Sequence, residues 1–251
     1  MVPIKRLLKL ILGLLCVTFQ FLNLWYHMYF FVRYFLLDFA LTNLKVIPAA
    51  LMSCIGVYFL VRVNILLMLC VYTNAGSVTH VRDSRKGCDS VRVKRMNLEV
   101  VTGDDKATLL DIHGSYKASC RNQPMCDKCN EVKFARAHHC TTCGQCVLRM
   151  DHHCPWLNNC IGVANFRFFV QLLLHVSLGS CFTLLCIYTC RDSGLWHHAF
   201  GNAWVFVAMH SFMGFFFFTY FMYYVWLVNR DLTSFDLFYR QEKDRRYTRF
   251  V

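Results

Sequence analysis

Residues 138–160 read HHCTTCGQCVLRMDHHCPWLNNC, and nine of these 23 residues are cysteine or histidine. Thiolate sulfur and imidazole nitrogen are the ligands that zinc most often takes in proteins. The triplet Cys140-x2-Cys143-x2-Cys146 and the preceding pair Cys126-x2-Cys129 share one spacing. At that spacing a tight turn brings two thiolates onto one ion. The sequence therefore predicts a metal-binding core over residues 126–160.

The number of ligand-type residues in this core exceeds what two zinc ions need. A structural zinc site takes four ligands and leaves no position open. Six cysteines and two histidines close two such sites, and the obvious histidines are His139 and His153, each next to a cysteine. The residues then left over are Cys154, His152, His138 and Asp151.

The leftover cysteine lies beside groups that suit a nucleophile. The thiolate is the reactive form of cysteine; a neighbouring histidine can take the thiol proton, and a carboxylate can orient the imidazole. Cys154, His152 and Asp151 offer this combination within four residues. Two alternatives stay open: Cys154 is a packing thiol, or it is a metal ligand in exchange with Cys160 or Cys146.

Four apolar stretches indicate a membrane protein. The chain is 56% hydrophobic, and Leu10–Val32, Phe168–Cys190 and Ala203–Val228 carry no charge. About 20 helical residues cross a hydrocarbon core, so each stretch is long enough to span a bilayer. A fourth stretch, Val46–Thr73, contains Arg62, which is expected to face protein, water or an interface. The alternative is that Arg62 snorkels or ends a shorter span. We expect the first stretch to be an uncleaved anchor, because no small-residue cleavage site follows it.

The basic residues set the expected topology. The net charge is +12, and 23 of the 27 lysines and arginines lie in the N-terminus, in residues 74–167 or in the tail after Val228. Basic flanks belong on the cytoplasmic side, so both termini are expected there and the number of spans is even. This topology and attraction to anionic headgroups of the lipid bilayer explain the charge without nucleic acid. Cytosolic thiols stay reduced, which favours metal binding over disulfides.

The predicted organisation has four parts. Residues 1–73 hold a cytosolic N-terminus and two transmembrane helices, and residues 74–167 form a cytosolic Cys-rich domain with its zinc core at 126–160. Residues 168–228 hold two more transmembrane helices, and residues 229–251 form a cytosolic tail. The fold class is therefore mainly α: a polytopic membrane protein with four transmembrane helices and a small two-zinc domain between helices 2 and 3. Residues 74–125 lack a sustained period, which indicates loop and short strand.

The segment DHHCPWLNNCIG, with the cysteine and histidine pattern that begins at Cys126, resembles the Asp-His-His-Cys protein S-acyltransferases. These are integral-membrane palmitoyltransferases, and the resemblance covers residues 126–169 densely. It implies two structural zinc ions. The first would be held by Cys126, Cys129, His139 and Cys146, and the second by Cys140, Cys143, His153 and Cys160.

The resemblance also implies an activity and its residues. Cys154 would be acylated by a long-chain fatty acyl-CoA and would pass the acyl group to a cysteine of a substrate protein. His152 would act as base, oriented by Asp151. Lys133 and Arg136 would meet the phosphates of coenzyme A, with a solvated basic loop as the alternative.

Of three further positions, two have two interpretations each and one has a single interpretation. Trp156 would lie beside the reaction centre, or it belongs to an interfacial aromatic belt. Gly179 would leave the end of an acyl tunnel open, or it allows close helix packing. His138 resembles a neighbour of the ligands that does not itself bind zinc.

Two motifs depart from the family pattern, which leaves domain packing and full activity open. Asn74-Ala75-Gly76 stands where the family often has Asp-Pro-Gly, and Thr233-Ser234-Phe235-Asp236 stands where it usually has Thr-Thr-x-Glu. The competing function is a membrane-anchored zinc-binding scaffold with weak or no acyltransferase activity. The resemblance places the protein in the endoplasmic reticulum or Golgi and allows for an accessory subunit.

Overall fold

A computed structural model describes residues 46–81, 90–95, 98–101, 126–129, 133, 136–190 and 203–239, together with seven residues between Ile11 and Trp25. The chain divides into two compact units. The first, called here the Cys-rich unit, contains Met1–Leu14, Leu69–Arg167 and Leu227–Val251. The second, called here the helical unit, contains Leu15–Met68 and Phe168–Trp226.

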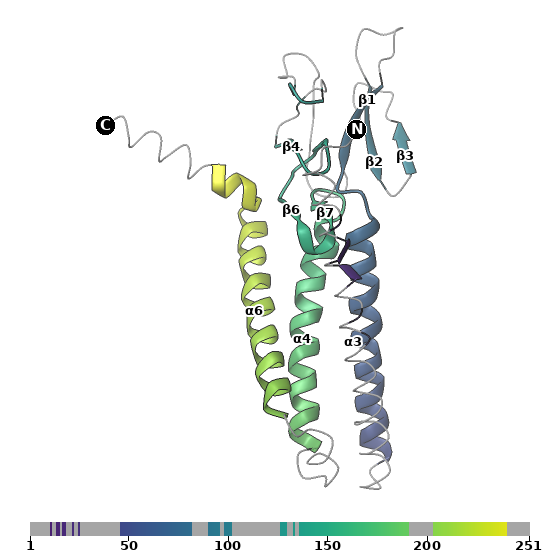
Figure 1. The fold of residues 1–251 in the computed structure, drawn as a ribbon, viewed down its shortest axis with the longest axis vertical. Coiled ribbons are helices and arrows are strands. Elements are labelled where there is room, and N and C mark those ends of the chain that lie inside the picture. The colour runs from purple at the N-terminus through teal and green to yellow at the C-terminus, as the bar shows by residue number, and fades with distance from the viewer. Residues whose placement is uncertain are drawn as a thin grey trace, which may run out of the picture. The chain divides into compact units, whose positions relative to one another are not determined.

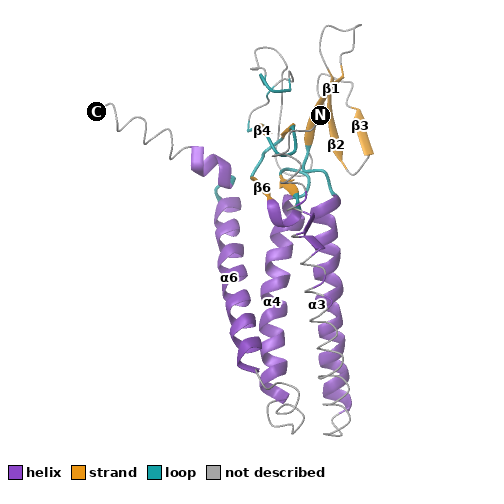
Figure 2. Cartoon of the chain, viewed as in Figure 1, coloured by secondary structure: helices purple, strands orange, loops and turns teal. Residues whose placement is uncertain are grey.

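Three long helices match three of the predicted spans to within two residues at each end. They are α3 (Val46–Tyr72), α4 (Phe166–Cys190) and α6 (Ala203–Asn229), drawn as the long coils of Figures 1 and 2. All three are long and apolar enough to cross a membrane. The stretch predicted at Leu10–Val32 lies largely outside the described residues, so the total of four spans stays a prediction.

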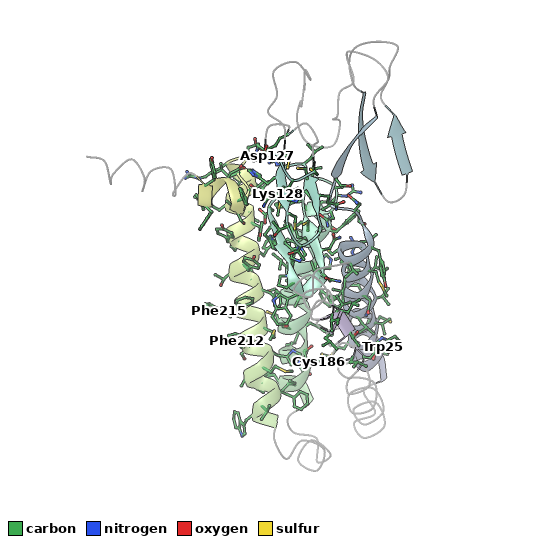
Figure 3. The ribbon with its side chains drawn as sticks, turned by 45° about the horizontal axis from the view of Figure 1, so that its top comes forward. Trp25, Asp127, Lys128, Cys186, Phe212 and Phe215 are labelled. Atoms are coloured by element: carbon green, nitrogen blue, oxygen red, sulfur yellow. The ribbon has the colours of Figure 1, made fainter. Side chains whose placement is uncertain are left out.

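Aromatic side chains cover much of α6. Phe212 and Phe215 project outward from this helix in Figure 3, and their side chains are 60% and 75% exposed. A charge-free helix with large exposed apolar side chains is stable in lipid, because hydrocarbon solvates those side chains as well as a protein core does. This surface is what a membrane-spanning helix requires.

Small residues set the packing within the helical unit. Ser177 of α4 donates a hydrogen bond to the carbonyl oxygen of Gly214 of α6 at 3.0 Å. A Cβ at Gly214 would lie 3.5 Å from the Cβ of Ser180, so the two backbones approach closely. A Cβ at Gly179 would lie 3.7 Å from the Phe59 side chain of α3, an ordinary van der Waals distance, so this position faces α3 and has room for a methyl group.

Arg62 lies inside a continuous helix. Helix α3 runs on to Tyr72, so Arg62 does not end the span. Its Nη2 donates to Oε1 of Gln171 on α4 at 2.9 Å, and one turn away Tyr58 contacts the His175 ring nitrogen at 3.4 Å. A charged side chain within the hydrocarbon is stabilised by facing a polar partner on a neighbouring helix.

The Cys-rich unit contains short strands, as the sequence indicated for residues 74–125. The five-stranded sheet has the order β3-β2-β1-β5-β4, and the two-stranded sheet pairs β6 with β7. The strands are β1 (Ser77–Val81), β2 (Ser90–Arg95), β3 (Leu98–Val101), β4 (His138–Cys140), β5 (Gln145–Val147), β6 (His152–Cys154) and β7 (Asn159–Ile161). A buried cluster of Ala75, Cys140, Val147, Met150 and Cys160 forms its core.

The departure from Asp-Pro-Gly preserves the turn after α3. The side-chain oxygen of Asn74 accepts hydrogen bonds from the backbone N–H groups of Gly76 and Ser77, as an aspartate would. Gly76 has a φ of +101°, which favours glycine. Ala75 is fully buried, and its carbonyl oxygen accepts from the N–H of Ala164. This local turn therefore forms without the proline.

Candidate active site and metal-binding groups

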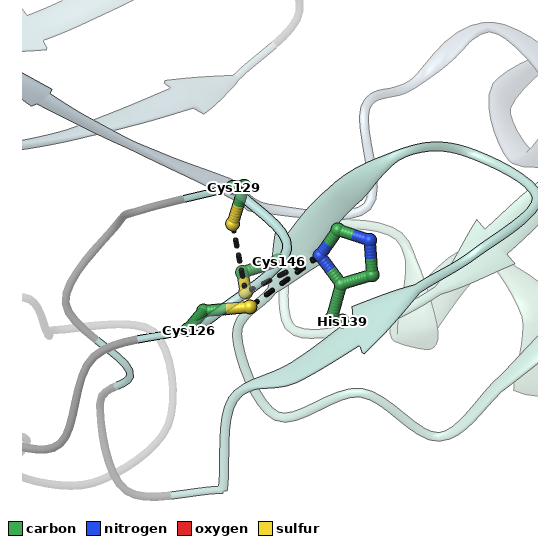
Figure 4. Close-up of side chains that lie close together, drawn as sticks. All are labelled: Cys126, Cys129, His139 and Cys146. Carbon is green, nitrogen blue, oxygen red and sulfur yellow. Dashed lines mark hydrogen bonds between the residues drawn. The ribbon is translucent and has the colours of Figure 1, made fainter.

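The first group of ligand atoms is held by a hairpin and a turn. His139 on β4 lies directly opposite Cys146 on β5, so both side chains lie on one face of the hairpin. The turn at residues 126–129 adds two cysteines (Figure 4). Cys126 Sγ lies 3.6 Å from His139 Nδ1, and Cys129 Sγ lies 3.5 Å from Cys146 Sγ.

The second group repeats this construction. His153 on β6 lies directly opposite Cys160 on β7. Cys140 and Cys143, from the end of β4 and the loop after it, complete the set. The sulfurs of Cys143 and Cys160 are 3.4 Å apart, and the three sulfur atoms lie 3.4–3.7 Å from His153 Nδ1.

Both groups have dimensions that suit a tetrahedral zinc ion. Bonds of about 2.3 Å to sulfur and about 2.0 Å to nitrogen place two sulfurs about 3.8 Å apart, and sulfur and nitrogen about 3.6 Å apart. The four ligand atoms of each group all lie within 4.8 Å of one another. Three thiolates and one imidazole form a donor set typical of structural zinc. The two groups contain the same residues as the two sets named from the resemblance.

The two groups are related by a sequence repeat that sequence reasoning missed. Every ligand of the second group lies 14 residues after its counterpart in the first. The pairing registers match as well: His139 opposes Cys146, and His153 opposes Cys160. The constant offset was the signal that could have revealed the repeat. By the same offset Cys154 corresponds to Cys140, but Leu157 stands where the second cysteine of a pair would be.

Cys154 belongs to neither ligand group among the described residues. It ends β6, precedes the short helical turn η2 (Pro155–Leu157), and is 6% exposed. Its partner across the hairpin is Asn159, whose amide donates to the carbonyl oxygens of Cys70 and Thr73 at 2.9 and 2.8 Å. These carbonyls lie at the end of α3 and have no partner within that helix, so Asn159 caps them. The strand opposite Cys154 is thereby fixed to the helix end.

Asp151 and His152 form a buried pair beside this cysteine. The Asp151 side chain is fully buried, and its Oδ2 lies 2.7 Å from His152 Nδ1. Burial alone disfavours the imidazolium, but hydrogen bonds with Asp151 and Cys154 outweigh it and raise the pKa of His152 to about 9. The arrangement can therefore hold a proton on His152, beside Cys154.

The second oxygen of Asp151 binds a segment distant in sequence. Asp151 Oδ1 accepts a hydrogen bond from the backbone N–H of Ser234 at 2.7 Å. Thr233 and Asp236 flank this residue and cap one another's backbone N–H groups, at 3.1 and 3.0 Å. The shortened carboxylate of this motif therefore still forms a capping box.

The other predicted residues lie at different places in the unit. The ring of His138 packs against Phe235 with 3.9 Å between ring centroids, and burial together with Lys133 lowers the pKa of His138 despite Asp236. His138 is absent from both ligand groups. Lys133 is half-buried, and Trp156 on η2 is 58% exposed. Arg136 makes ion pairs with Asp231 and Asp236.

Known proteins resemble part of this chain, from the Cys-rich core through helices α4 and α6. Residues 119–241 match the family model described as DHHC palmitoyltransferase. Palmitoyltransferase ZDHHC15 of Xenopus laevis is 39% identical over 121 residues, which cover 45% of this chain and 35% of that protein. Palmitoyltransferase ZDHHC20 of Homo sapiens is 37% identical over 126 residues, which cover 45% and 32%. The match therefore spans about a third of these relatives' length.

Proposed function

We propose that the protein is a membrane-bound protein S-palmitoyltransferase, because residues 119–241 match the DHHC palmitoyltransferase family model, in agreement with the resemblance. Cys154 takes the acyl group from a long-chain fatty acyl-CoA and passes it to a cysteine of a substrate protein. One observation carries this proposal. Cys154 is a buried thiol next to the Asp151–His152 pair, and it lies outside both ligand groups.

The reaction consists of two thioester exchanges. In the first, Cys154 Sγ attacks the thioester carbonyl of acyl-CoA, so a bond from carbon to Cys154 sulfur forms and the bond to coenzyme A sulfur breaks. The proton leaves Cys154 for His152 and then protonates the departing coenzyme A thiolate. In the second exchange the substrate cysteine gives its thiol proton to His152 and attacks the Cys154 thioester. A bond from the acyl carbon to the substrate sulfur forms, the bond to Cys154 sulfur breaks, and His152 returns the proton to Cys154. Asp151 holds the His152 ring in one orientation and stabilises its protonated form.

The two ligand groups hold structural zinc in this proposal. A zinc ion in each group would have a full set of four ligands, so it would crosslink the hairpins and contribute to folding. The donor sets support this assignment, because soft thiolates suit zinc and both sets are preformed. No step of the acyl transfer passes through the metal.

The remaining assignments extend the proposal to the surroundings of the site. Lys133 and Trp156 contact coenzyme A, while the partners of Arg136 suggest a different role for that residue. Residues 1–73, 74–167, 168–228 and 229–251 form the four parts named above, with both termini and the catalytic domain in the cytosol. The protein resides in the endoplasmic reticulum or Golgi and acts on cytosol-facing cysteines, with an accessory subunit as a further partner.

Acylation of the purified full-length protein tests this function. Wild-type protein incubated with an alkyne-tagged palmitoyl-CoA is expected to carry a label that hydroxylamine removes, and Cys154→Ser is expected to carry none. Cys54→Ser, which changes an exposed cysteine of α3, is the matched control and should label like the wild type. If the wild type binds two zinc ions per chain and stays unlabelled, the alternative of a zinc-binding scaffold replaces the proposal.

A further inference from the structure

Four charged residues of the Cys-rich unit form one network, called here the ion-pair cluster: Arg136, Arg149, Asp231 and Asp236. Arg136 donates through Nη1 to Asp231 Oδ2 at 3.0 Å, and through Nη2 to the Asp231 backbone oxygen at 2.7 Å. Its Nε donates to Asp236 Oδ2 at 3.0 Å. Arg149 pairs with the second carboxylate oxygen of Asp231. All three nitrogens of the Arg136 guanidinium therefore face this segment.

The backbone of the cluster has an unusual conformation. Arg136, Arg149 and Asp231 have φ values of 62°, 45° and 50°, and the only other non-glycine residue with positive φ in the described part of the chain is Asn158. Residues with a Cβ seldom adopt this region and keep it where surrounding interactions fix them there. Three of the four such residues thus belong to one ion-pair network.

The cluster leads to the proposed catalytic residues through a short chain of contacts. Asp236 caps the N–H of Thr233, and the next residue, Ser234, donates its N–H to Asp151 Oδ1 at 2.7 Å. The other oxygen of Asp151 binds His152. Residues 231–236 therefore bind the two arginines of the cluster at one end. Through the Ser234 N–H they also fix the Asp151 carboxylate, which in turn orients His152.

We propose that the ion-pair cluster locks residues 231–236 onto the Cys-rich core, and that Arg136 is thereby a positioning residue for acyl transfer and not a ligand of the coenzyme A phosphates. The inference rests on the proposed function. It assigns Arg136 and Asp231 to one mechanical task, which is to keep the Ser234 N–H against Asp151.

Charge balance in the cluster supports this assignment. Two guanidinium groups face two carboxylates, so the formal charges cancel. A phosphate that bound Arg136 would have to displace carboxylate oxygens already in hydrogen-bonding contact. It would also approach Asp231, whose side chain is 72% exposed and negatively charged. Fork-shaped guanidinium groups bind carboxylates as well as phosphates, and here the carboxylates belong to the protein.

Two acyl donors separate positioning from phosphate binding. The full-length protein is assayed with palmitoyl-CoA and with S-palmitoyl-N-acetylcysteamine, a thioester without nucleotide or phosphates. The variants are Arg136→Lys, which keeps the charge and loses the fork, and Asp231→Asn, which removes an exposed carboxylate. Asp127→Asn, another exposed aspartate of the same unit, is the matched control.

Positioning predicts that both variants acylate Cys154 more slowly by roughly 10- to 100-fold, by the same factor with both donors, because a catalytic group held loosely loses its alignment. The KM for palmitoyl-CoA should stay unchanged, and Asp231→Glu should restore part of the rate. A phosphate ligand predicts the opposite pattern. In that case Arg136→Lys raises the KM for palmitoyl-CoA alone, Asp231→Asn lowers it, and the inference is overturned.

Hydrogen exchange keeps the test independent of the proposed function. The backbone amides of 232–239 should exchange faster in Asp231→Asn than in the wild type, with two zinc ions still bound. Unchanged exchange overturns the inference even if activity falls. If the wild type shows no acylation, the proposed function fails, and faster exchange in Asp231→Asn still supports the lock on residues 231–236.

Discussion

Replacing Asp151 by asparagine removes the charge that faces His152 while leaving the shape of the side chain. The buried Asp151 Oδ2 lies 2.7 Å from His152 Nδ1, and Oδ1 accepts from the Ser234 N–H. An asparagine can keep only one of these contacts in the same form, because its second terminal atom is an NH₂ group that donates. Oriented to accept from Ser234, it presents a donor to His152 and disfavours the protonated ring.

The expected size of the effect follows from this contact. A hydrogen bond to a charged group contributes about 1.5–3 kcal/mol. If that energy stabilises the protonated His152 during proton transfer, its loss slows the first acylation by roughly 10- to 150-fold, since each 1.36 kcal/mol is tenfold in rate. The two ligand groups do not include Asp151, so the zinc content should stay at two ions per chain.

Single-turnover labelling measures this rate directly. Purified Asp151→Asn and wild-type protein are mixed with tagged palmitoyl-CoA, quenched at short times and compared by in-gel fluorescence, with zinc measured on the same samples. Asp127→Asn, an exposed aspartate near the first ligand group, serves as the matched control and should label at the wild-type rate. A rate for Asp151→Asn within about threefold of the wild type, which is about 0.7 kcal/mol, would refute the assigned role of Asp151.

Two further predictions concern stability. Gly162→Ala places a Cβ 2.5 Å from the Ala75 carbonyl oxygen and 2.5 Å from Val147 Cγ1, so it should destabilise the Cys-rich unit by about 1–3 kcal/mol. Gly179→Ala, whose nearest contact would be at 3.7 Å, should be tolerated. Thermal unfolding of both variants checks this, and an unfolding midpoint that is the same for the two variants contradicts it. Removal of zinc by a strong chelator should abolish acylation while the far-ultraviolet helix signal persists. The reason is that the ligand groups lie in the Cys-rich unit, whereas the helices carry their own backbone hydrogen bonds. Acylation that survives with no zinc bound would contradict the structural role of the ions.

The sequence predicted the membrane helices well because length and lack of charge alone decide them. The described spans agree with the predicted ones near both ends, and Arg62 proved to lie within its helix since Gln171 supplies a polar partner. The resemblance also named the residues that the structure gathers into two ligand groups. Spacing and residue type carry that information locally, so no knowledge of the tertiary fold was needed.

Long-range contacts could not be predicted in the same way. Asp231 and Asp236 lie 95 and 100 residues from Arg136, and no local pattern indicates that they meet. The resemblance implied that Arg136 meets the coenzyme A phosphates, and the sequence revealed neither of its two carboxylate partners. The cap that Asn159 places on α3 was missed for the same reason. Contacts of this kind depend on the folded arrangement of segments, which neither periodicity nor composition records.

The 14-residue offset between the ligand groups has a consequence for the proposed nucleophile, Cys154. The first hairpin supplies Cys140 and Cys143 to the second ligand group. The equivalent positions of the second hairpin are Cys154 and Leu157, so the cysteine pair is not repeated there. Cys154 ends β6 as Cys140 ends β4, but among the described residues no third ligand group includes it. The second hairpin thus carries a buried sulfur atom at a position equivalent to that of a ligand and outside both ligand groups, as the proposed nucleophile requires.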